Sequence, residues 1–238
     1  MQVLELTLPS VPENLALDEA LLLQAEAGHG PEVLRFWEWQ RSAIVLGSGC
    51  RLIEDVEVEV CRQDEVPIWR RASGGGTVLL GPGCLCFSLV LAYDRSPALQ
   101  DIRPSYRYIL ERLADGLTGL LPHLTPAGTS DLAAGGQKFS GNSQQRKRNY
   151  LLHHGTLLYD FDLSQVGRYL RMPPRQPDYR RSRAHTAFLV NLPCDVTELK
   201  DRLRAAWEAN REMPVWPEEM VRKLTAEKYA TTAWVHRR

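Results

Sequence analysis

Three consecutive glycines, Gly74 to Gly76, lie between two short apolar segments and constrain the fold more than any other stretch. The segments, 66–69 and 78–80, are typical of strands. In a purely structural turn three glycines would be costly, because glycine loses the most backbone entropy on folding. They are better explained if the backbone comes close to a bound molecule, with N–H groups free to point at it. We therefore predict a binding loop.

The residues around the glycines favour the same interpretation. Arg70 and Arg71 come directly before the loop, and a guanidinium group is suited to carboxylates and phosphates. Ser73 adds a hydroxyl group next to the first glycine. The alternative is a glycine-rich hairpin loop whose arginines are solvated.

A second motif follows, with Gly-Gly-Gln-Lys-Phe-Ser-Gly-Asn at 135–142, a basic loop at 145–149 and His-Gly-Thr at 154–156. Together with Arg-Arg-Ala-Ser-Gly-Gly-Gly-Thr-Val at 70–78, this motif resembles the lipoate–protein ligase A family, within the wider biotin/lipoate ligase group. The resemblance covers roughly residues 10 to 200, with both motifs in the family's order and spacing.

The resemblance implies an enzyme that activates lipoate, or octanoate, with ATP and Mg²⁺ to an acyl-adenylate. The acyl group then passes to a lysine of a lipoyl carrier domain, whose surface we expect to be acidic or neutral. A separate accessory ligase subunit stays open as a second partner. The implied fold is the class II synthetase-like catalytic domain of biotin and lipoate protein ligases, an α/β (α+β) domain with a mixed, largely antiparallel sheet flanked by helices.

The resemblance also assigns site residues. Lys138 matches the family's essential lysine and would bridge the acyl carbonyl and the α-phosphate, since developing negative charge calls for fixed positive charge. Asp131 matches an acidic position that helps to hold nucleotide or magnesium. Without the resemblance, both residues are ordinary turn residues. The matches expected to border the acyl-adenylate are Arg71, Ser73, Gly74, Gly75, Gly76, Thr77, Ser140, Gly141, His154, Gly155 and Thr156.

Neighbouring residues carry further expectations. His154 is expected to organise the site through hydrogen bonds rather than to titrate in the reaction. His153 could be a surface neighbour, and Trp37 or Trp69 could line the acyl pocket. The chain departs from the family pattern at Leu80, often histidine, at Thr129-Ser130 before Asp131, often Arg-Asn, and at Gln144-Gln145, where an arginine is frequent. It also lacks room for the C-terminal accessory domain of larger ligases.

The nearest alternative is an octanoyl or lipoyl transferase, which carries the acyl group on an activated cysteine thiolate. None of the five cysteines lies between residues 87 and 193, and Cys84 and Cys86 are predicted to be core residues. A biotin ligase fits the glycine loop less well. The non-enzyme alternative is a catalytically silent subunit of a two-component ligase, against which the retained Lys138 argues.

The charge balance and the lengths of the apolar runs argue against nucleic-acid-binding, membrane-spanning and secreted proteins. Lys+Arg and Asp+Glu both number 29, so the chain has no basic field of the kind that binds nucleic acid. No apolar run has the length of a membrane span, and the N-terminus does not read as a signal peptide. The cysteines are odd in number and lack zinc-site spacing, which is typical of a reduced, cytoplasmic setting.

Hydrophobic patterns predict one domain over 1–238, of which 190–238 is a C-terminal helical segment. Asn14 is the predicted N-cap of the first helix. The mixture of helices and short strands is typical of an α/β or α+β domain. We expect helices at 15–27, 53–64 (by the resemblance), 104–121, 163–170, 196–211 and 218–229, and strands at 2–8, 33–39, 42–46, 66–69, 78–80, 85–92, 130–134, 137–147 and 151–159.

Overall fold

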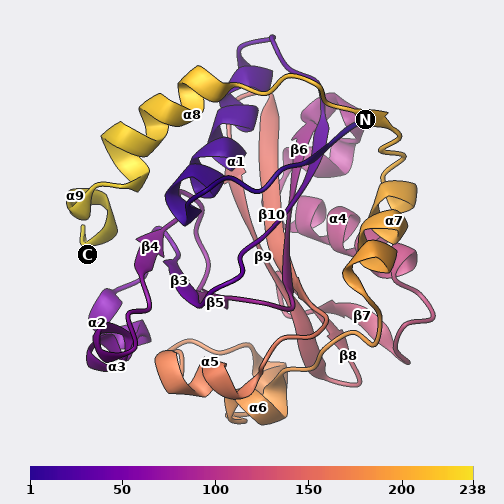
Figure 1. Cartoon of the computed structure of the whole chain (residues 1–238). Helices are drawn as coiled ribbons and strands as arrows, with labels where there is room; N and C mark the ends of the chain where they lie inside the picture. The colour runs from indigo at the N-terminus through magenta and orange to yellow at the C-terminus, as the bar shows by residue number, and fades with distance from the viewer. Residues whose placement is uncertain (238) are drawn as a thin grey trace.

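A computed structural model describes residues 1–237, and within them a large mixed sheet carries the fold (Figure 1). The strand order is β11-β1-β2-β6-β10-β9-β8-β7, antiparallel except where β1 pairs with β2 and β11. These strands are β1 (Gln2–Glu5), β2 (Val33–Glu38), β6 (Cys84–Ala92), β7 (Leu124–Ala127), β8 (Asp131–Ala134), β9 (Gln137–Arg146), β10 (Tyr150–Leu158) and β11 (Arg211–Glu212). A smaller sheet, in the order β4-β3-β5, consists of β3 (Ala43–Leu46), β4 (Ile68–Arg70) and β5 (Val78–Leu80).

Helices cover both faces of the large sheet, because alternate residues of each strand point to opposite faces. Helix α1 (Val11–Glu26) and the small sheet pack on one face in a first core cluster. Helices α4 (Ile102–Gly116) and α7 (Val196–Ala206) pack on the other face in a second cluster. The two-residue period therefore gives β6 and β10 one side toward α1 and one side toward α4.

Helix α1 begins earlier than predicted. Ser10 is the N-cap: its Oγ accepts from the Glu13 backbone N–H at 3.3 Å and donates to the Glu13 carboxylate at 2.6 Å. Pro12 lies in the first turn, where a missing N–H costs nothing. The prediction of Asn14 as the cap is wrong, because Asn14 is buried inside the helix and bonds the carbonyls of Leu8 and Ser10.

Other boundaries differ for identifiable reasons. The helix predicted at 53–64 is split into α2 (Leu52–Asp55) and α3 (Val58–Gln63), because Val56 forms a β-bridge with Leu170. Strands β7 and β11 and helix α6 (His185–Phe188) were not predicted. Helix α4 ends five residues before the predicted boundary. The remaining helices are α5 (Ser164–Tyr169), α8 (Glu218–Leu224) and α9 (Thr232–Val235).

The C-terminal segment returns to the N-terminal half of the molecule. After α8, a short π-helix at Thr225–Tyr229 packs on α1. The side chains of Lys228 and Tyr229 bond the Glu19 carboxylate there at 2.6 and 2.7 Å. The Trp234 indole N–H donates to the Arg70 carbonyl at 2.8 Å. The segment thus braces the strand that leads into the glycine loop. In the part of the chain that the structure describes, no helix has the length and apolar character needed to cross a membrane.

Candidate active site

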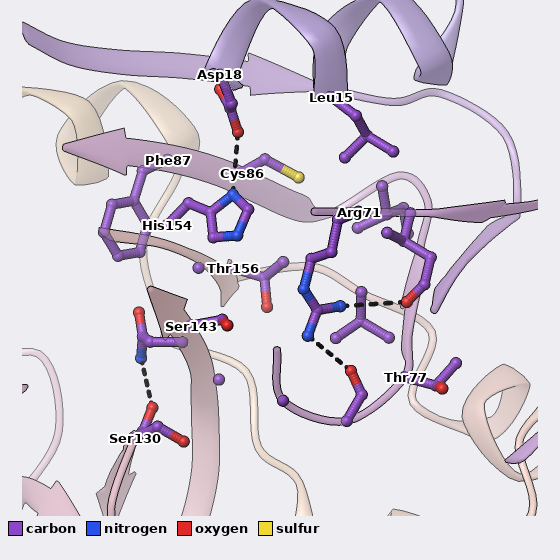
Figure 2. Close-up of a pocket in the computed structure, with 18 of the residues that line it drawn as sticks. Leu15, Asp18, Arg71, Thr77, Cys86, Phe87, Ser130, Ser143, His154 and Thr156 are labelled. Atoms are coloured by element: carbon purple, nitrogen blue, oxygen red, sulfur yellow. Dashed lines mark hydrogen bonds and ion pairs between the residues drawn. The ribbon is translucent and has the colours of Figure 1, made fainter. Parts of the chain in front are cut away.

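A cavity with about 690 Å³ of space, its open mouth included, lies between the large sheet, α1 and the glycine loop (Figure 2). Ten of the predicted site residues line it, and Trp37 does so as expected. Ser73, Gly74 and Ser140 do not, nor does Trp69. The predicted residues in the lining are Arg71, Gly75, Gly76, Thr77, Asp131, Lys138, Gly141, His154, Gly155 and Thr156.

Strand register arranges the floor of this cavity as a row. Trp37 of β2 pairs with Cys86 of β6, Cys86 with Thr156 of β10, Thr156 with Gly141 of β9, and Gly141 with Asp131 of β8. Residues directly opposite each other in antiparallel strands present their side chains on the same face. We call these five residues the channel row. It runs from an apolar end at Trp37 to a charged end at Asp131.

Lys138 completes the charged end. Its Nζ lies 2.8 Å from Oδ1 of Asp131, whose Oδ2 accepts from the Tyr179 hydroxyl at 2.8 Å. The lysine side chain stays 27% exposed, so its ammonium can meet a ligand. It also lies over Gly141, where an added Cβ would come within 2.7 Å of Nζ. A glycine at 141 therefore leaves the space that the lysine head occupies.

Arg71 shapes the glycine loop. Its Nε donates to Ser73 Oγ, one Nη to the Val45 carbonyl, and the other Nη to the carbonyls of Gly74 and Gly76 at 2.6 and 2.8 Å. Burial lowers its pKa to about 10, so the guanidinium stays charged at neutral pH. The loop is thus folded around Arg71, which both lines the cavity and holds its wall in shape.

Arg70 is also buried, so the alternative of solvated arginines is wrong. It donates to the carbonyls of Val235, Gly47 and Cys50 and so joins the C-terminal segment to the turn after β3. Gly75 has φ +80°, which favours glycine, and a Cβ on Gly47 would overlap the Gly75 carbonyl oxygen. A positive φ therefore explains Gly75, and close packing of backbone on backbone explains Gly47.

A second row seats the loop on the sheet. Arg35, Ser88, His154 and Ser143 are paired across β2, β6, β10 and β9, on the same face as the channel row. His154 Nε2 lies 2.5 Å from Ser73 Oγ, and Ser143 Oγ donates to the Gly74 carbonyl at 2.8 Å. We call these four residues the polar row. Its contacts fix the glycine loop above the channel.

A charged network behind His154 fixes the imidazole. His154 Nδ1 lies 3.1 Å from Asp18 Oδ2 (Figure 2). The other Asp18 oxygen pairs with Arg35 at 2.5 Å. Burial alone would raise the pKa of Asp18, but Arg35 and His154 outweigh it and hold that pKa below its usual value. With Asp18 accepting from Nδ1, Nε2 is left to accept from the Ser73 hydroxyl.

The order Asp18–His154–Ser73 is that of a serine-hydrolase triad, but Ser73 is not placed as a nucleophile. It is 2% exposed, does not line the cavity and accepts from Arg71. The expectation that His154 organises the site agrees with these contacts. The unpredicted partners, Asp18 and Arg35, gave a partial signal: Arg35 is a charged residue among the apolar residues Val33, Leu34, Phe36 and Trp37 of β2, whereas Asp18 is one of four acidic residues in α1.

His153 is fully buried, so its prediction as a surface residue is wrong. Burial lowers its pKa to about 3, which keeps the ring neutral. Its nitrogens contact the Gln144 amide at 3.2 Å and the Asn142 Oδ1 at 3.3 Å. Asn142 in turn passes over Gly155, where a Cβ would overlap Oδ1, so glycine is needed there. The alternation of β10 places His153 on the same face as the core residues Leu151 and Leu157.

Three cysteines lie nearest the site, and two of them have raised pKa values. Cys84 is a core residue, as predicted. Cys86 is 4% exposed but lies on the cavity wall, and burial raises its pKa well above the usual value. Cys50 Sγ donates to the Gly75 carbonyl at 3.3 Å, and burial raises its pKa as well. Because a nucleophilic cysteine must be a thiolate, the raised pKa values argue against activation of Cys86 and Cys50.

Within residues 1–237, no group of three or more His, Cys, Asp or Glu side chains is placed to hold a metal ion. The carboxylate that faces the cavity beside Lys138 is that of Asp131. A magnesium ion commonly uses one or two carboxylates together with substrate phosphates. Asp131 therefore has the donor chemistry for such a shared site, with lone pairs left on both oxygens.

The chain is similar to known proteins over most of its length. The family model described as the lipoyl protein ligase A/B catalytic domain matches residues 10–215. A probable lipoate-protein ligase A of Mycoplasma pneumoniae is 28% identical over 92% of this chain, which spans only 60% of that protein's length. An octanoyltransferase LipM of Carboxydothermus hydrogenoformans is 30% identical over 94% of both chains.

Solved structures share the fold. A Thermoplasma acidophilum structure with bound lipoic acid has TM-score 0.85 at 22% identity, covering 100% of this chain and 99% of that one. A bi-partite lipoate protein ligase of the same organism, described with its E2 lipoyl domain, has TM-score 0.83 at 22% identity. That match covers 99% of this chain and 95% of the other. A lipoate-protein ligase A bound with ATP has TM-score 0.80 at 24% identity, over 99% of this chain and 98% of the other. The predicted fold class is confirmed, and with the family model matched over most of its length, the chain belongs to the lipoyl protein ligase A/B catalytic domain family.

Proposed function

We propose that the protein is an ATP-dependent lipoate–protein ligase. It activates lipoate or octanoate to an acyl-adenylate and transfers the acyl group to a lysine of a lipoyl carrier domain. The observation that carries this proposal is the channel row, which joins an apolar end at Trp37 and Cys86 to a charged end at Asp131 and Lys138. An apolar chain with a carboxylate head matches both ends at once.

Each end of the cavity has a role in this reaction. The Lys138 ammonium stabilises the negative charge that develops on the carboxyl and phosphate oxygens, and the N–H groups of the Gly75–Gly76 loop add fixed dipoles. Apolar neighbours from α1 and the small sheet, including Leu15, Val45 and Leu80, exclude water from the chain. Site residues therefore act by positioning and electrostatics, with no covalent enzyme intermediate.

ATP and Mg²⁺ would bind at the charged end. The solved ligase bound with ATP supports a nucleotide as a substrate, and the one described with its E2 lipoyl domain supports a lipoyl carrier as partner. Asp131 would hold the metal together with the phosphates. We further propose that 1–238 functions as a single domain, since the C-terminal segment packs on α1 and β4.

An octanoyltransferase is the second candidate function. The 30% identical relative of that name and the position of Cys86 on the cavity wall favour it. Such an enzyme takes an activated thioester from a carrier and needs a thiolate but no ATP. The raised pKa of Cys86 supports the ligase instead. For a catalytically silent subunit, ATP–pyrophosphate exchange would be absent.

The deciding experiment separates the two mechanisms by their need for thiols. A variant in which all five cysteines are replaced by serine or alanine should retain ATP-dependent acylation of a lipoyl domain, measured by intact mass with lipoate, ATP and Mg²⁺. Buried replacements cost about 1 kcal/mol each, so folding is checked first by circular dichroism. ATP-independent transfer from an octanoyl carrier, lost on removal of one cysteine, would contradict the ligase proposal.

The fit of Lys138 over Gly141 gives a more local prediction. In Gly141→Ala the new Cβ displaces the lysine head, and a misplacement of about 1 Å lowers carrier acylation about a hundredfold. Thermal stability should change little, because only the flexible end of Lys138 has to move. Gly167→Ala is the matched control, since nothing lies within 4 Å of the added atom. Equal rates for both variants would show that the position of the lysine head does not matter.

A further inference from the structure

Cys86 has no part in the chemistry described above, yet its position is specific. It lies in the channel row between Trp37 and Thr156, on the wall of the cavity. Its neighbours along β6, Leu85 and Phe87, are large, and both belong to the core cluster on the α4 side of the sheet. On the α1 side of the sheet, the small side chain of Cys86 faces the apolar end of the cavity.

The row provides a distance scale. Adjacent strands lie about 4.8 Å apart, so Cys86 is two spacings, or about 10 Å, from Gly141. The Lys138 head lies over Gly141 and marks the position of the acyl carboxyl. An extended eight-carbon chain spans roughly 9 Å, given carbon–carbon bonds of about 1.5 Å at tetrahedral angles. The end of such a chain therefore reaches Cys86, and Trp37 closes the row behind it.

We propose that Cys86 is the residue that sets the length of the acyl chain, by leaving at the apolar end room for eight carbons. This inference rests on the proposed function, which places the carboxyl group at Lys138. The neutral thiol offers a soft, polarizable surface that suits both a methyl end and the sulfur ring of lipoate. Exchange with that ring would need a thiolate, so the contact is one of packing.

Cys84 provides a matched control. It lies two residues from Cys86 on the same strand and the same face, and it is equally buried. It pairs with Leu158 rather than Thr156, outside the channel row, and it does not line the cavity. The Cys84 and Cys86 thiols interact, so a change at Cys84 tests the effect of altering a buried β6 cysteine that touches Cys86 but is not itself part of the cavity wall.

The test measures binding of straight-chain fatty acids of four to twelve carbons by isothermal titration calorimetry, without ATP or carrier. The wild-type protein should bind octanoate best. Cys86→Leu replaces the sulfur and makes the side chain larger by two non-hydrogen atoms, so its optimum should shift about two carbons shorter, and octanoate should bind at least about tenfold more weakly. Cys86→Ala should move the optimum toward longer chains, and Cys84→Ala should leave it at eight.

The outcomes separate this inference from the proposed function. If the wild type prefers eight carbons and both Cys86 variants keep that optimum, the role of Cys86 is overturned and the ligase proposal stands. If the wild type binds no acid in the series, both fall. Should Cys86→Leu fail to fold in thermal melts, Cys86→Ala decides the question, because an unchanged optimum in that variant also overturns the inference.

Discussion

Replacing Lys138 by alanine is expected to slow carrier acylation by about a hundredfold or more, equivalent to roughly 3–4 kcal/mol of transition-state stabilisation. The reason is the loss of the ammonium that faces the developing charge at the end of the channel row. The fold should survive, because the side chain is partly exposed at the edge of the cavity. Single-turnover acylation of a lipoyl domain, followed by intact mass, measures the effect.

The control for this variant lies on the same hairpin. Lys147 follows β9 at its other end, so Lys147→Ala removes the same charge away from the cavity. It should acylate the carrier at the wild-type rate. Because Lys138→Ala leaves Asp131 without its ion pair, the double variant Lys138→Ala/Asp131→Asn shows how much of the loss is due to the unpaired carboxylate. Wild-type turnover in folded Lys138→Ala would remove Lys138 from the mechanism.

Arg35→Met is expected to lower the free energy of unfolding by about 3–5 kcal/mol, the usual cost of leaving a buried charge without its partner. Both members of the Arg35–Asp18 pair are almost completely buried, at 0% and 3% side-chain exposure. Arg35 also donates to the Asn14 side chain and to the Leu6 carbonyl. Urea unfolding of wild type and variant gives the difference.

Two further variants make the result specific. Arg62→Met breaks an exposed pair with Glu59 and should cost at most about 1 kcal/mol. Asp18→Asn combined with Arg35→Met removes the lone buried charge and should recover part of the stability. If Arg35→Met costs no more than Arg62→Met, the buried pair does not stabilise the fold. A loss confined to activity would instead limit its role to holding His154.

The sequence predicted most of the residues that line the cavity, because its two motifs match a known family in order and spacing. The glycine loop could be interpreted from its residues alone, whereas Lys138 and Asp131 were assigned through the resemblance. The position of α1 was harder to predict, since Asn14 is a good cap by type. Its bonds to Leu8, Ser10 and Arg35 hold it inside the helix, while Ser10 caps the end.

Residues that act through neighbours on other strands could not be predicted. Cys86 and Thr156 are 70 positions apart, and only the register of β6 and β10 places them side by side. The same holds for Ser73 and His154, which meet across two sheets. His153 is the exception, since the alternation of β10 was readable. Arg71 carried a signal for anions, but its donors are directed at loop carbonyls that no local pattern reveals.

The crosswise course of the channel row affects how the specificity of such a site can change over evolution. Each of its five positions belongs to a different strand, and all are joined by backbone hydrogen bonds that do not depend on side-chain identity. A substitution at one position can therefore alter the cavity locally without shifting register elsewhere. In a cavity that runs along one strand, by contrast, all the lining positions would belong to the same segment of the chain. Descendants of this scaffold can thus acquire new ligand preferences through single substitutions at the apolar end while the charged end is preserved.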